Sequence, residues 1–508
     1  MEKRAILALA LSFLVFIVFG YLQQKYYPPT EPAPPSRAEA PKAVAPPPAS
    51  TPAPVAALPQ PGTPVQPAKE VTVDTPLWRA VFTTQGARLK SFKLKKYWDQ
   101  LPFTKIASYG FWFFSIDIER YADPNGRISQ PKELIQLAGG GPWPLTLSWE
   151  GEGSSLGPDE VFQSEVEQLT VSTGEQRLSF IAHQPGGLAL VKTFIFRADS
   201  YRIDLKTTVK NLGSQSLQGQ IKLVLSELGG HGTDSSFTGI IYETKKGGES
   251  LATGSLKAPK VIPGPTWTAL EKGYFLKAVV PQATLPTQAL LQETPDKVLS
   301  ATLQTEVAAL PAGQELTLPY VLYFGPKDLE ILKSLGLGLE KTVDFGWFQF
   351  LALPLLYVLK FFYKYLGNYG LAILALTVLI RILFLYPNHK SFKSMQAMQK
   401  LQPKIAKLRE KYKDDRETLN KELMALYRTY KVNPLGGCLP MLLQLPVFIA
   451  LYNILGYAIE LRHAPCIPTL PFTNIVWLAD LSAKDPLLIT PLIMGATMFI
   501  QQKMTPSP

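Results

Sequence analysis

Long apolar runs, separated by segments of very different composition, constrain this 508-residue chain more than any other feature. The first run, residues 5–22, contains no charged residue over 18 positions. As a helix it would reach ~27 Å, close to the ~30 Å thickness of a bilayer's hydrocarbon core. Only 18% of all residues are charged, against about 25% in an ordinary soluble domain. The pattern predicts membrane helices joined to water-soluble parts.

The N-terminal segment predicts an uncleaved signal anchor over residues 1–22. Lys3 and Arg4 precede the apolar run, which places the N-terminus in the cytoplasm. A cleaved secretory signal begins in a similar way, but the following GYLQQKYYPP lacks a small-x-small cleavage site. A Pro/Ala-rich linker over 23–69 follows, with 15 prolines from residue 28 onward, and it indicates an extended spacer.

Residues 70–340 change to an alternating pattern that predicts a large antiparallel β domain. Apolar and polar side chains alternate over 201–210, as in a half-buried strand. The spacing predicts a three-strand meander of this segment with 188–197 and with a strand near Ile221–Leu225. With one span before it and the N-terminus inside, the domain is expected in the periplasm.

A second hairpin is expected near the start of this domain. Residues 77–84 and 88–95 are strand-like, and they flank the turn Gln85-Gly86-Ala87.

The β region lacks the motifs of common hydrolases, metalloproteases and nucleotide-binding enzymes. The segments His231–Ser236 and Gly139–Gly141 are expected to be loops, because catalytic triads assemble from separated segments. Four histidines and two cysteines in the whole chain leave little for a metal site. The sequence therefore predicts no enzyme, and no catalytic, cofactor-binding or metal site.

The C-terminal third predicts the rest of a multi-pass α-helical membrane protein. Lysines, tyrosines and a tryptophan among apolar residues predict an interfacial amphipathic helix over 345–366. Apolar runs then predict a second span at 370–387, a third at 434–459, a periplasmic loop at 460–485 and a fourth span at 486–502.

Residues 388–433 predict a basic cytoplasmic helical hairpin. They hold 12 lysines and arginines against 5 acidic residues, which the positive-inside rule assigns to the cytoplasm. Two helical repeats of apolar residues flank Asp414-Asp415, which is placed to cap the second helix. Such a hairpin also suits RNA binding, but topology and headgroup contact explain its charge without a specific nucleic acid.

Arg381 is the one charge in the 17-residue apolar run 370–386. An arginine within a membrane helix costs ~2.5–3.5 kcal/mol on insertion scales. One interpretation is that it extends to the cytoplasmic surface, about 8 Å of helix away. The other is that it faces a wet cavity, with Thr377 one turn earlier and Gln444 from the next span. Such a cavity would attract acidic polypeptide.

Three segments together resemble a known family. They are LTVLIRILFLYPNHKSFKSMQAMQKLQPKIAKLREKY, MALYRTYKVNPLGGCLPMLLQLPVFIALYN and DPLLITPLIMGATMFIQQKM. This set, with the anchor, linker and β domain before it, is similar to the long bacterial form of the YidC/Oxa/Alb membrane protein insertases.

The resemblance implies a function and a site. The protein would be located in the cell inner membrane. Its β domain would be a periplasmic supersandwich, like sugar-mutarotase folds but without their activity. Nascent membrane proteins would enter a positively charged groove and pass into the lipid bilayer, alone or with the Sec translocon, and the ribosome would be a partner. The groove residues fall on Arg381, Thr377, Gln444, Leu445 and Phe448, and no cofactor is implied.

The family continues with two more spans and a basic tail, so the sequence ending at Pro508 is expected to be truncated and its groove to lack a wall. Two other classes of protein share some of these sequence features. A polytopic transporter or channel would suit an intramembrane arginine and proline-broken helices, but no repeat relates the two halves. A membrane-anchored carbohydrate enzyme is opposed by the missing catalytic motifs.

Overall fold

The computed structural model describes residues 68–504 except 100, 102, 112–113, 122–129, 137–141, 152–153, 185, 230–236, 284, 414, 431 and 433–438. The expected first span and all but the last two residues of the expected linker lie outside the described residues. So do the two loops expected at His231–Ser236 and Gly139–Gly141.

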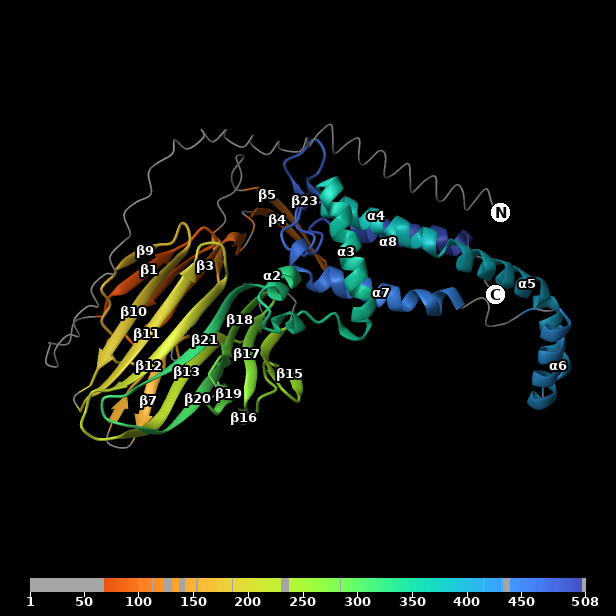
Figure 1. Ribbon diagram of the computed structural model, residues 1–508. Coiled ribbons are helices and arrows are strands. Elements are labelled where there is room, and N and C mark those ends of the chain that lie inside the picture. The colour runs from red at the N-terminus through yellow and green to blue at the C-terminus, as the bar shows by residue number, and fades with distance from the viewer. Residues whose placement is uncertain are drawn as a thin grey trace, which may run out of the picture.

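Three sheets form the β domain (Figure 1). The eight-stranded sheet has the order β10 (Glu175–His183), β11 (Leu188–Arg197), β12 (Arg202–Asn211), β21 (Glu315–Pro326), β18 (Phe275–Pro281), β17 (Pro265–Lys272), β14 (Thr238–Thr244) and β15 (Gly247–Ala252). The six-stranded sheet has the order β16 (Lys260–Pro263), β19 (Thr287–Glu293), β20 (Val298–Leu310), β13 (Leu217–Leu228), β7 (Leu147–Gly151) and β8 (Ser154–Leu156). The five-stranded sheet has the order β6 (Pro131–Glu133), β3 (Arg88–Trp98), β2 (Trp78–Thr83), β1 (Glu70–Asp74) and β9 (Gln168–Thr170).

The prediction of a large antiparallel β domain is confirmed, with one exception. Strands β1 and β9 pair in parallel, whereas the other ladders of these three sheets are antiparallel. The eight-stranded and six-stranded sheets face each other, with β17 and β14 contacting β20. Alternation along the strands places one side of each in the shared core.

Aromatic side chains fill the core beneath the five-stranded sheet. The rings of Trp78 and Phe92 stack with centroids 4.9 Å apart, and those of Phe82 and Phe194 are also 4.9 Å apart. All four side chains are fully buried. Because β11 supplies Phe194 and β2 and β3 supply the others, these rings join the small sheet to the large one.

The predicted meander is half right. Strands β11 and β12 pair antiparallel as expected, but β12 takes β21 as its other neighbour. Strand β13 instead crosses into the six-stranded sheet, where it pairs with β20 and β7. Local spacing predicts neighbours in sequence, whereas burial of the apolar side of β13 against the opposite sheet decided this crossing.

The predicted hairpin around Gly86 is confirmed. Strands β2 and β3 pair antiparallel across the turn. Gly86 has a φ of +68°, and a Cβ there would lie 2.4 Å from the carbonyl oxygen of Pro158. Glycine is thus required by both the backbone conformation and the close approach.

Two small hairpins stand apart from these sheets. One consists of β4 (Phe103–Phe111) and β5 (Phe114–Tyr121), and the other of β22 (Ile467–Thr469) and β23 (Val476–Leu478). The second lies within the segment 460–485, which the sequence analysis treated as a plain loop. Strand β5 contacts β23, so the two hairpins meet.

Helices follow the β domain. They are α2 (Leu329–Ser334), α3 (Gln349–Leu366), α4 (Tyr369–Leu383), α5 (Leu385–Lys411), α6 (Arg416–Thr429), α7 (Leu439–Tyr457) and α8 (Ile489–Met504). Short 3₁₀ turns lie at Leu339–Thr342 (η1), Gly346–Phe348 (η2) and Ile459–Leu461 (η4). In Figure 1, α4, α7 and α8 extend away from the β domain, and α3 runs crosswise to them at their near ends.

Few of the described helices satisfy a length and composition criterion for a membrane span. Gly346–Leu366 satisfies it alone, and α4 with α5 satisfies it as a pair bent by 56°. The apolar helix Leu442–Tyr457 is shorter than the criterion requires.

The break between α3 and α4 has a local cause. Gly367 ends α3 with a φ of +63°, a left-handed conformation that glycine adopts without strain. The side chain of Asn368 then accepts a hydrogen bond from the amide of Leu371 and caps α4. The amide group of Asn368 also donates to the carbonyl oxygen of Cys466 at 3.0 Å. The start of α4 is thereby tied to the loop after α7.

The basic hairpin consists of α5 and α6. Helix α5 begins at Leu385, directly after α4, so it starts earlier than the apolar repeat suggested. The predicted cap is confirmed at Asp415, whose carboxylate accepts from the amides of Glu417 and Thr418.

Candidate functional site

Arg381 and Thr377 lie one turn apart on α4, and both side chains are exposed. The hydroxyl of Thr377 donates to the carbonyl oxygen of Ile373 at 2.8 Å, so it is satisfied within its own helix. Within the described part of the chain, no ion pair or hydrogen bond engages the Arg381 guanidinium. Its charge is available to an incoming group.

The other three expected site residues lie on α7. Leu445 is 50% exposed and Phe448 is 63% exposed, while Gln444 is partly buried. The Phe448 ring stacks near that of Tyr452, one turn later, with centroids 6.5 Å apart. This part of α7 presents an apolar surface with one amide group beside it.

The structure places these two groups on different helices that share α3 as a neighbour. Helix α3 packs against both α4 and α7 and holds them in one helical unit. Among the described residues, no hydrogen bond, ion pair or ring contact links Arg381 or Thr377 to Gln444, Leu445 or Phe448. The arrangement therefore offers a single cation, Arg381, on α4 and an apolar strip on α7.

Two polar side chains that the sequence pattern did not predict as structural contacts hold these helices in place. Lys360 of α3 forms an ion pair with Glu460 after α7, with 2.5 Å between Nζ and Oε1. The side chain of Asn453 on α7 donates to the carbonyl oxygen of Phe345 at 2.6 Å. A polar residue within an apolar run, such as Asn453, is the signal that points to such a contact.

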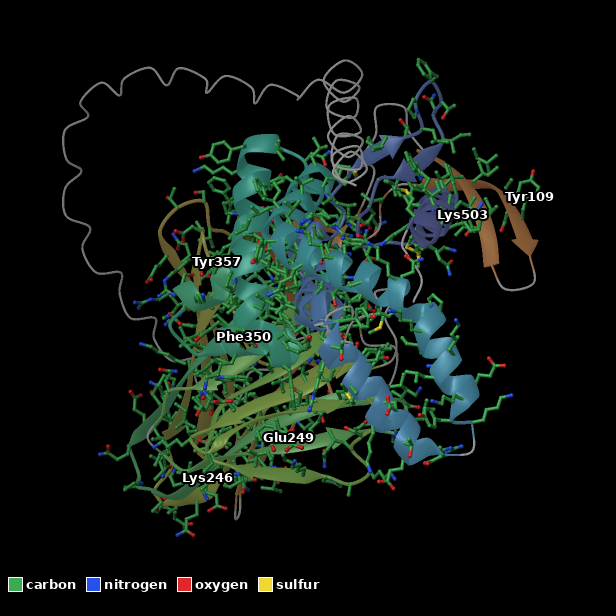
Figure 2. All side chains as sticks on the ribbon, turned by 90° about the vertical axis from the view of Figure 1, so that its right-hand side faces the viewer. Tyr109, Lys246, Glu249, Phe350, Tyr357 and Lys503 are labelled. Atoms are coloured by element: carbon green, nitrogen blue, oxygen red, sulfur yellow. The ribbon has the colours of Figure 1, made fainter. Side chains whose placement is uncertain are left out.

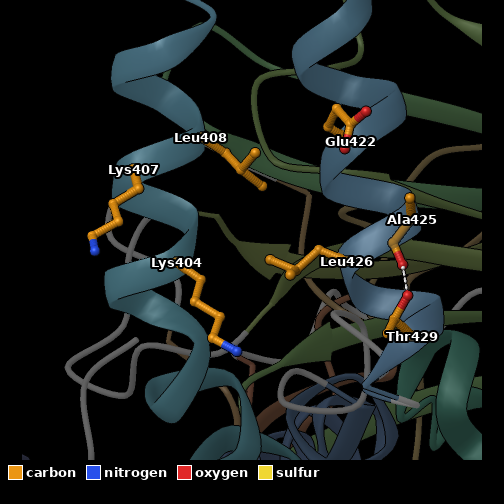
Figure 3. Close-up of a pocket in the computed structure, with 7 residues that line it drawn as sticks. All are labelled: Lys404, Lys407, Leu408, Glu422, Ala425, Leu426 and Thr429. Carbon is orange, nitrogen blue, oxygen red and sulfur yellow. Dashed lines mark hydrogen bonds between the residues drawn. The ribbon is translucent and has the colours of Figure 1, made fainter.

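The basic hairpin presents a second candidate surface (Figure 3). Leu408 of α5 and Leu426 of α6 extend into the space between the helices, and Lys404 and Lys407 flank it. Lys404 lies over the Tyr430 ring, with Nζ 4.3 Å from the centroid. Helix α6 contains no buried residue, so it is held by few apolar contacts.

Comparisons with known proteins place both halves of the chain in one family. The family described as 60Kd inner membrane protein matches residues 361–508, and the YidC periplasmic domain matches residues 104–358.

Curated relatives match along the whole chain. The membrane protein insertase YidC of Syntrophus aciditrophicus is 40% identical over 100% of this chain and 91% of its own length. That of Geobacter metallireducens is 39% identical over 100% of this chain and 90% of its own length.

Solved structures share a likeness with about half of the chain. One is a putative aldose 1-epimerase from Escherichia coli K12, at 12% identity and a TM-score of 0.30, which covers 51% of this chain and 99% of its own. A galactose mutarotase-like protein from Lactobacillus casei has 11% identity and a TM-score of 0.30, and covers 50% of this chain and 99% of its own.

The curated relatives are about 40% identical along the whole chain, and the family matches cover both of its halves. Both findings agree with an architecture of a β domain, a crosswise helix and exposed apolar helices. The chain belongs to the YidC family of membrane protein insertases, which are not enzymes.

Proposed function

We propose that this insertase receives nascent membrane proteins at the surface formed by α4 and α7, with Arg381 as its positive centre, and releases them into the lipid bilayer. The observation that carries this proposal is an exposed arginine in an otherwise apolar helix, engaged by no described partner. Family membership does not favour the alternative of a transporter or channel.

Electrostatics explain why this position suits clients. A desolvated guanidinium gains most from an acidic group of a segment that must cross the membrane. At ~4 Å, the attraction between two unit charges is about 4 kcal/mol at an effective dielectric of 20. The neighbouring apolar side chains Leu445 and Phe448 would contact the client's apolar residues.

We further propose the topology and domain boundaries of a multi-pass inner-membrane protein. The spans are 1–22, 370–387, 434–459 and 486–502, with the N-terminus in the cytoplasm. The joint extension of α4, α7 and α8 away from the β domain supports this (Figure 1). The linker 23–69, the β domain 70–340 and the loop 460–485 are then periplasmic.

Helix α3 lies within the proposed interfacial segment 345–366. Residues Gly346–Leu366 are long and apolar enough to cross a membrane. However, the crosswise path of α3 over the near ends of α4 and α7 supports a position along the membrane surface (Figure 1). Exposed Phe350, Phe361 and Tyr365 suit that interface, where aromatic side chains are enriched.

The hairpin 388–433 is proposed to lie in the cytoplasm and to meet the ribosome and acidic headgroups. Its excess of lysine and arginine supports this. The Sec translocon is proposed as a second partner, because the family resemblance implies that the protein inserts clients both alone and together with Sec.

Site-specific crosslinking tests the client surface. A photoreactive residue would replace Leu445 or Phe448 on α7, and Phe361 on α3, which is 55% exposed, would serve as the matched control. A ribosome-bound membrane-protein client should crosslink to the α7 positions several-fold more than to Phe361. Equal crosslinking at all three positions would refute the proposed site.

A further inference from the structure

The small hairpin of β4 and β5 has two chemically different faces. Its register pairs Tyr109 with Ile116 and Ala107 with Ile118, so these four side chains share one face. The opposite face carries the pairs Ser108 with Asp117 and Lys105 with Glu119. The hairpin is therefore amphipathic, although it lies outside the three sheets of the β domain.

The polar face is the one that has partners within the protein. Asp117 is 8% exposed and accepts from the hydroxyl of Ser108 at 2.7 Å. Its carboxylate also pairs with Lys105 at 2.7 Å and with Lys484 at 3.2 Å. These cations and the hydroxyl hold the pKa of Asp117 well below its ordinary value.

Ala107, Ile116 and Ile118 of the apolar face are half-buried, whereas Tyr109 on this face and the strand bulge beside it are exposed. Tyr109 is 57% exposed, and Ile106, at the register shift between Lys105 and Ala107, is 54% exposed. A two-stranded hairpin is only marginally stable in water, since one face cannot bury itself. Something beyond the described contacts should cover Tyr109 and Ile106.

The position of the hairpin indicates what covers it. The amide of Asp117 donates to the carbonyl oxygen of Pro486 at 3.0 Å, three residues before α8 begins. Helix α8 exposes Leu492 and Ile493, at 72% and 54%, as a lipid-facing helix does. Figure 2 shows Tyr109 on a hairpin that projects sideways beside α8, whose Lys503 is also labelled.

We propose that the β4–β5 hairpin rests on the outer leaflet of the same membrane, with Tyr109, Ile106 and the apolar face in contact with lipid. Tyrosine and aliphatic side chains suit the boundary between headgroups and acyl chains. The hairpin would anchor the β domain beside the point where α8 enters the bilayer. This role goes beyond client insertion and rests on the proposed topology, in which the β domain is periplasmic and α8 enters the bilayer from that side.

Nitroxide accessibility tests the proposal in the full chain. With Cys438→Ala and Cys466→Ala as background, single labels would be placed by Tyr109→Cys, Ser108→Cys and Val261→Cys. Ser108 is the matched control on the opposite face of the same strand, and Val261, 53% exposed on the β domain, is the water reference. The protein would be studied in nanodiscs of phosphatidylethanolamine and phosphatidylglycerol.

The expected result is a ratio of oxygen to aqueous nickel-chelate collisions several-fold higher at Tyr109 than at Ser108 or Val261. Nickel accessibility at Tyr109 equal to that at Val261 would overturn the proposal, because the face would then be in water. Protection of Tyr109 from both reagents would also overturn it, because protein would then cover the face instead of lipid.

Discussion

Arg462, in the loop after α7, donates from its Nη1 to the carbonyl oxygen of Trp98, the last residue of β3, over 2.8 Å. Its Nη2 donates to the carbonyl oxygen of Asp99 at 3.1 Å, and the guanidinium lies 5.2 Å from the centre of the Phe275 ring. The Tyr274 hydroxyl donates to the carbonyl oxygen of Gly456 at 3.2 Å nearby. These contacts dock the β domain onto the end of the helical unit where α7 ends and the loop with Arg462 begins.

Replacing this arginine should loosen the docking. Arg462→Ala removes both charged hydrogen bonds, each of a kind that contributes ~1.5–3 kcal/mol. Hydrogen exchange should become faster at the end of β3 and in residues 458–464, with the core of the eight-stranded sheet unchanged. Arg462→Lys should recover only part of the protection, because an ammonium group lacks the planar fork. Unchanged exchange in the alanine variant would show that the contact does not hold the domains together.

Arg381 should act through its charge. Arg381→Lys should keep most insertion activity, because attraction to an acidic client needs charge and not bidentate geometry. Arg381→Ala should reduce insertion, most for clients whose translocated segment is acidic. Insertion of paired clients, acidic and neutralised, would be compared in the unsubstituted protein and in both variants. Equal loss for both clients, or equal failure of both variants, would contradict the mechanism.

The hairpin of α5 and α6 should exchange amide hydrogens faster than α4 and α7. Helix α6 buries none of its described side chains, and its ion pair Lys421–Glu417 is exposed and internal to the helix. Mass-spectrometric hydrogen exchange of the full chain in nanodiscs measures this directly. Protection over 416–429 equal to that of α7 would indicate a docked hairpin and contradict the prediction.

The buried pair Lys277–Glu227 should be required for stability of the β domain. Both side chains are 4% exposed, and Nζ lies 2.6 Å from the carboxylate. Lys277→Met should cost ~3–5 kcal/mol, because the buried carboxylate of Glu227 then keeps only its longer ion pair with Lys272, at 3.5 Å. The matched control is Lys90→Met at the exposed pair with Glu70, which should cost no more than ~1 kcal/mol.

Denaturant unfolding of the full chain in detergent, followed by the circular dichroism of the β-sheet, measures both losses. The double variant Lys277→Met with Glu227→Leu should be more stable than Lys277→Met alone, because the buried carboxylate is then removed together with its close partner. A double variant less stable than the single one would refute this account.

Cys466 should resist alkylation. Burial raises the pKa of its thiol from about 9 to about 11. The reactive thiolate at pH 8 is then about a hundredfold scarcer than for an unshifted thiol. In a Cys438→Ala background, maleimide labelling at pH 8 should be slow in the folded protein. Unfolding, which returns the pKa to its ordinary value, should accelerate it. Rapid labelling without unfolding would show an exposed thiol.

Several local features could be predicted because their causes are local. The alternation over 201–210 and the cap at Asp415 each depend on residues within a few positions, and the turn at Gly86 follows from its left-handed backbone conformation. The family could be predicted too, because its motifs are uninterrupted stretches of the sequence. Arg381 could be predicted as a candidate site residue, because a charged residue within an apolar run can be identified from the sequence alone.

Other features required the tertiary structure. The predicted position of the third meander strand was wrong, because β13 pairs with β20, about eighty residues away. Burial of apolar side chains between two sheets decides this pairing. The link from Arg462 to Trp98 joins residues 364 positions apart, and no local pattern encodes it.

By itself, the sequence determined the order of β domain and helices, since composition and periodicity are properties of the chain. Only the tertiary structure decided that the polar face of the β4–β5 hairpin turns toward Lys484 and leaves Tyr109 open. Strand register and the packing of distant segments set which face is covered, and neither is a property of the segment alone.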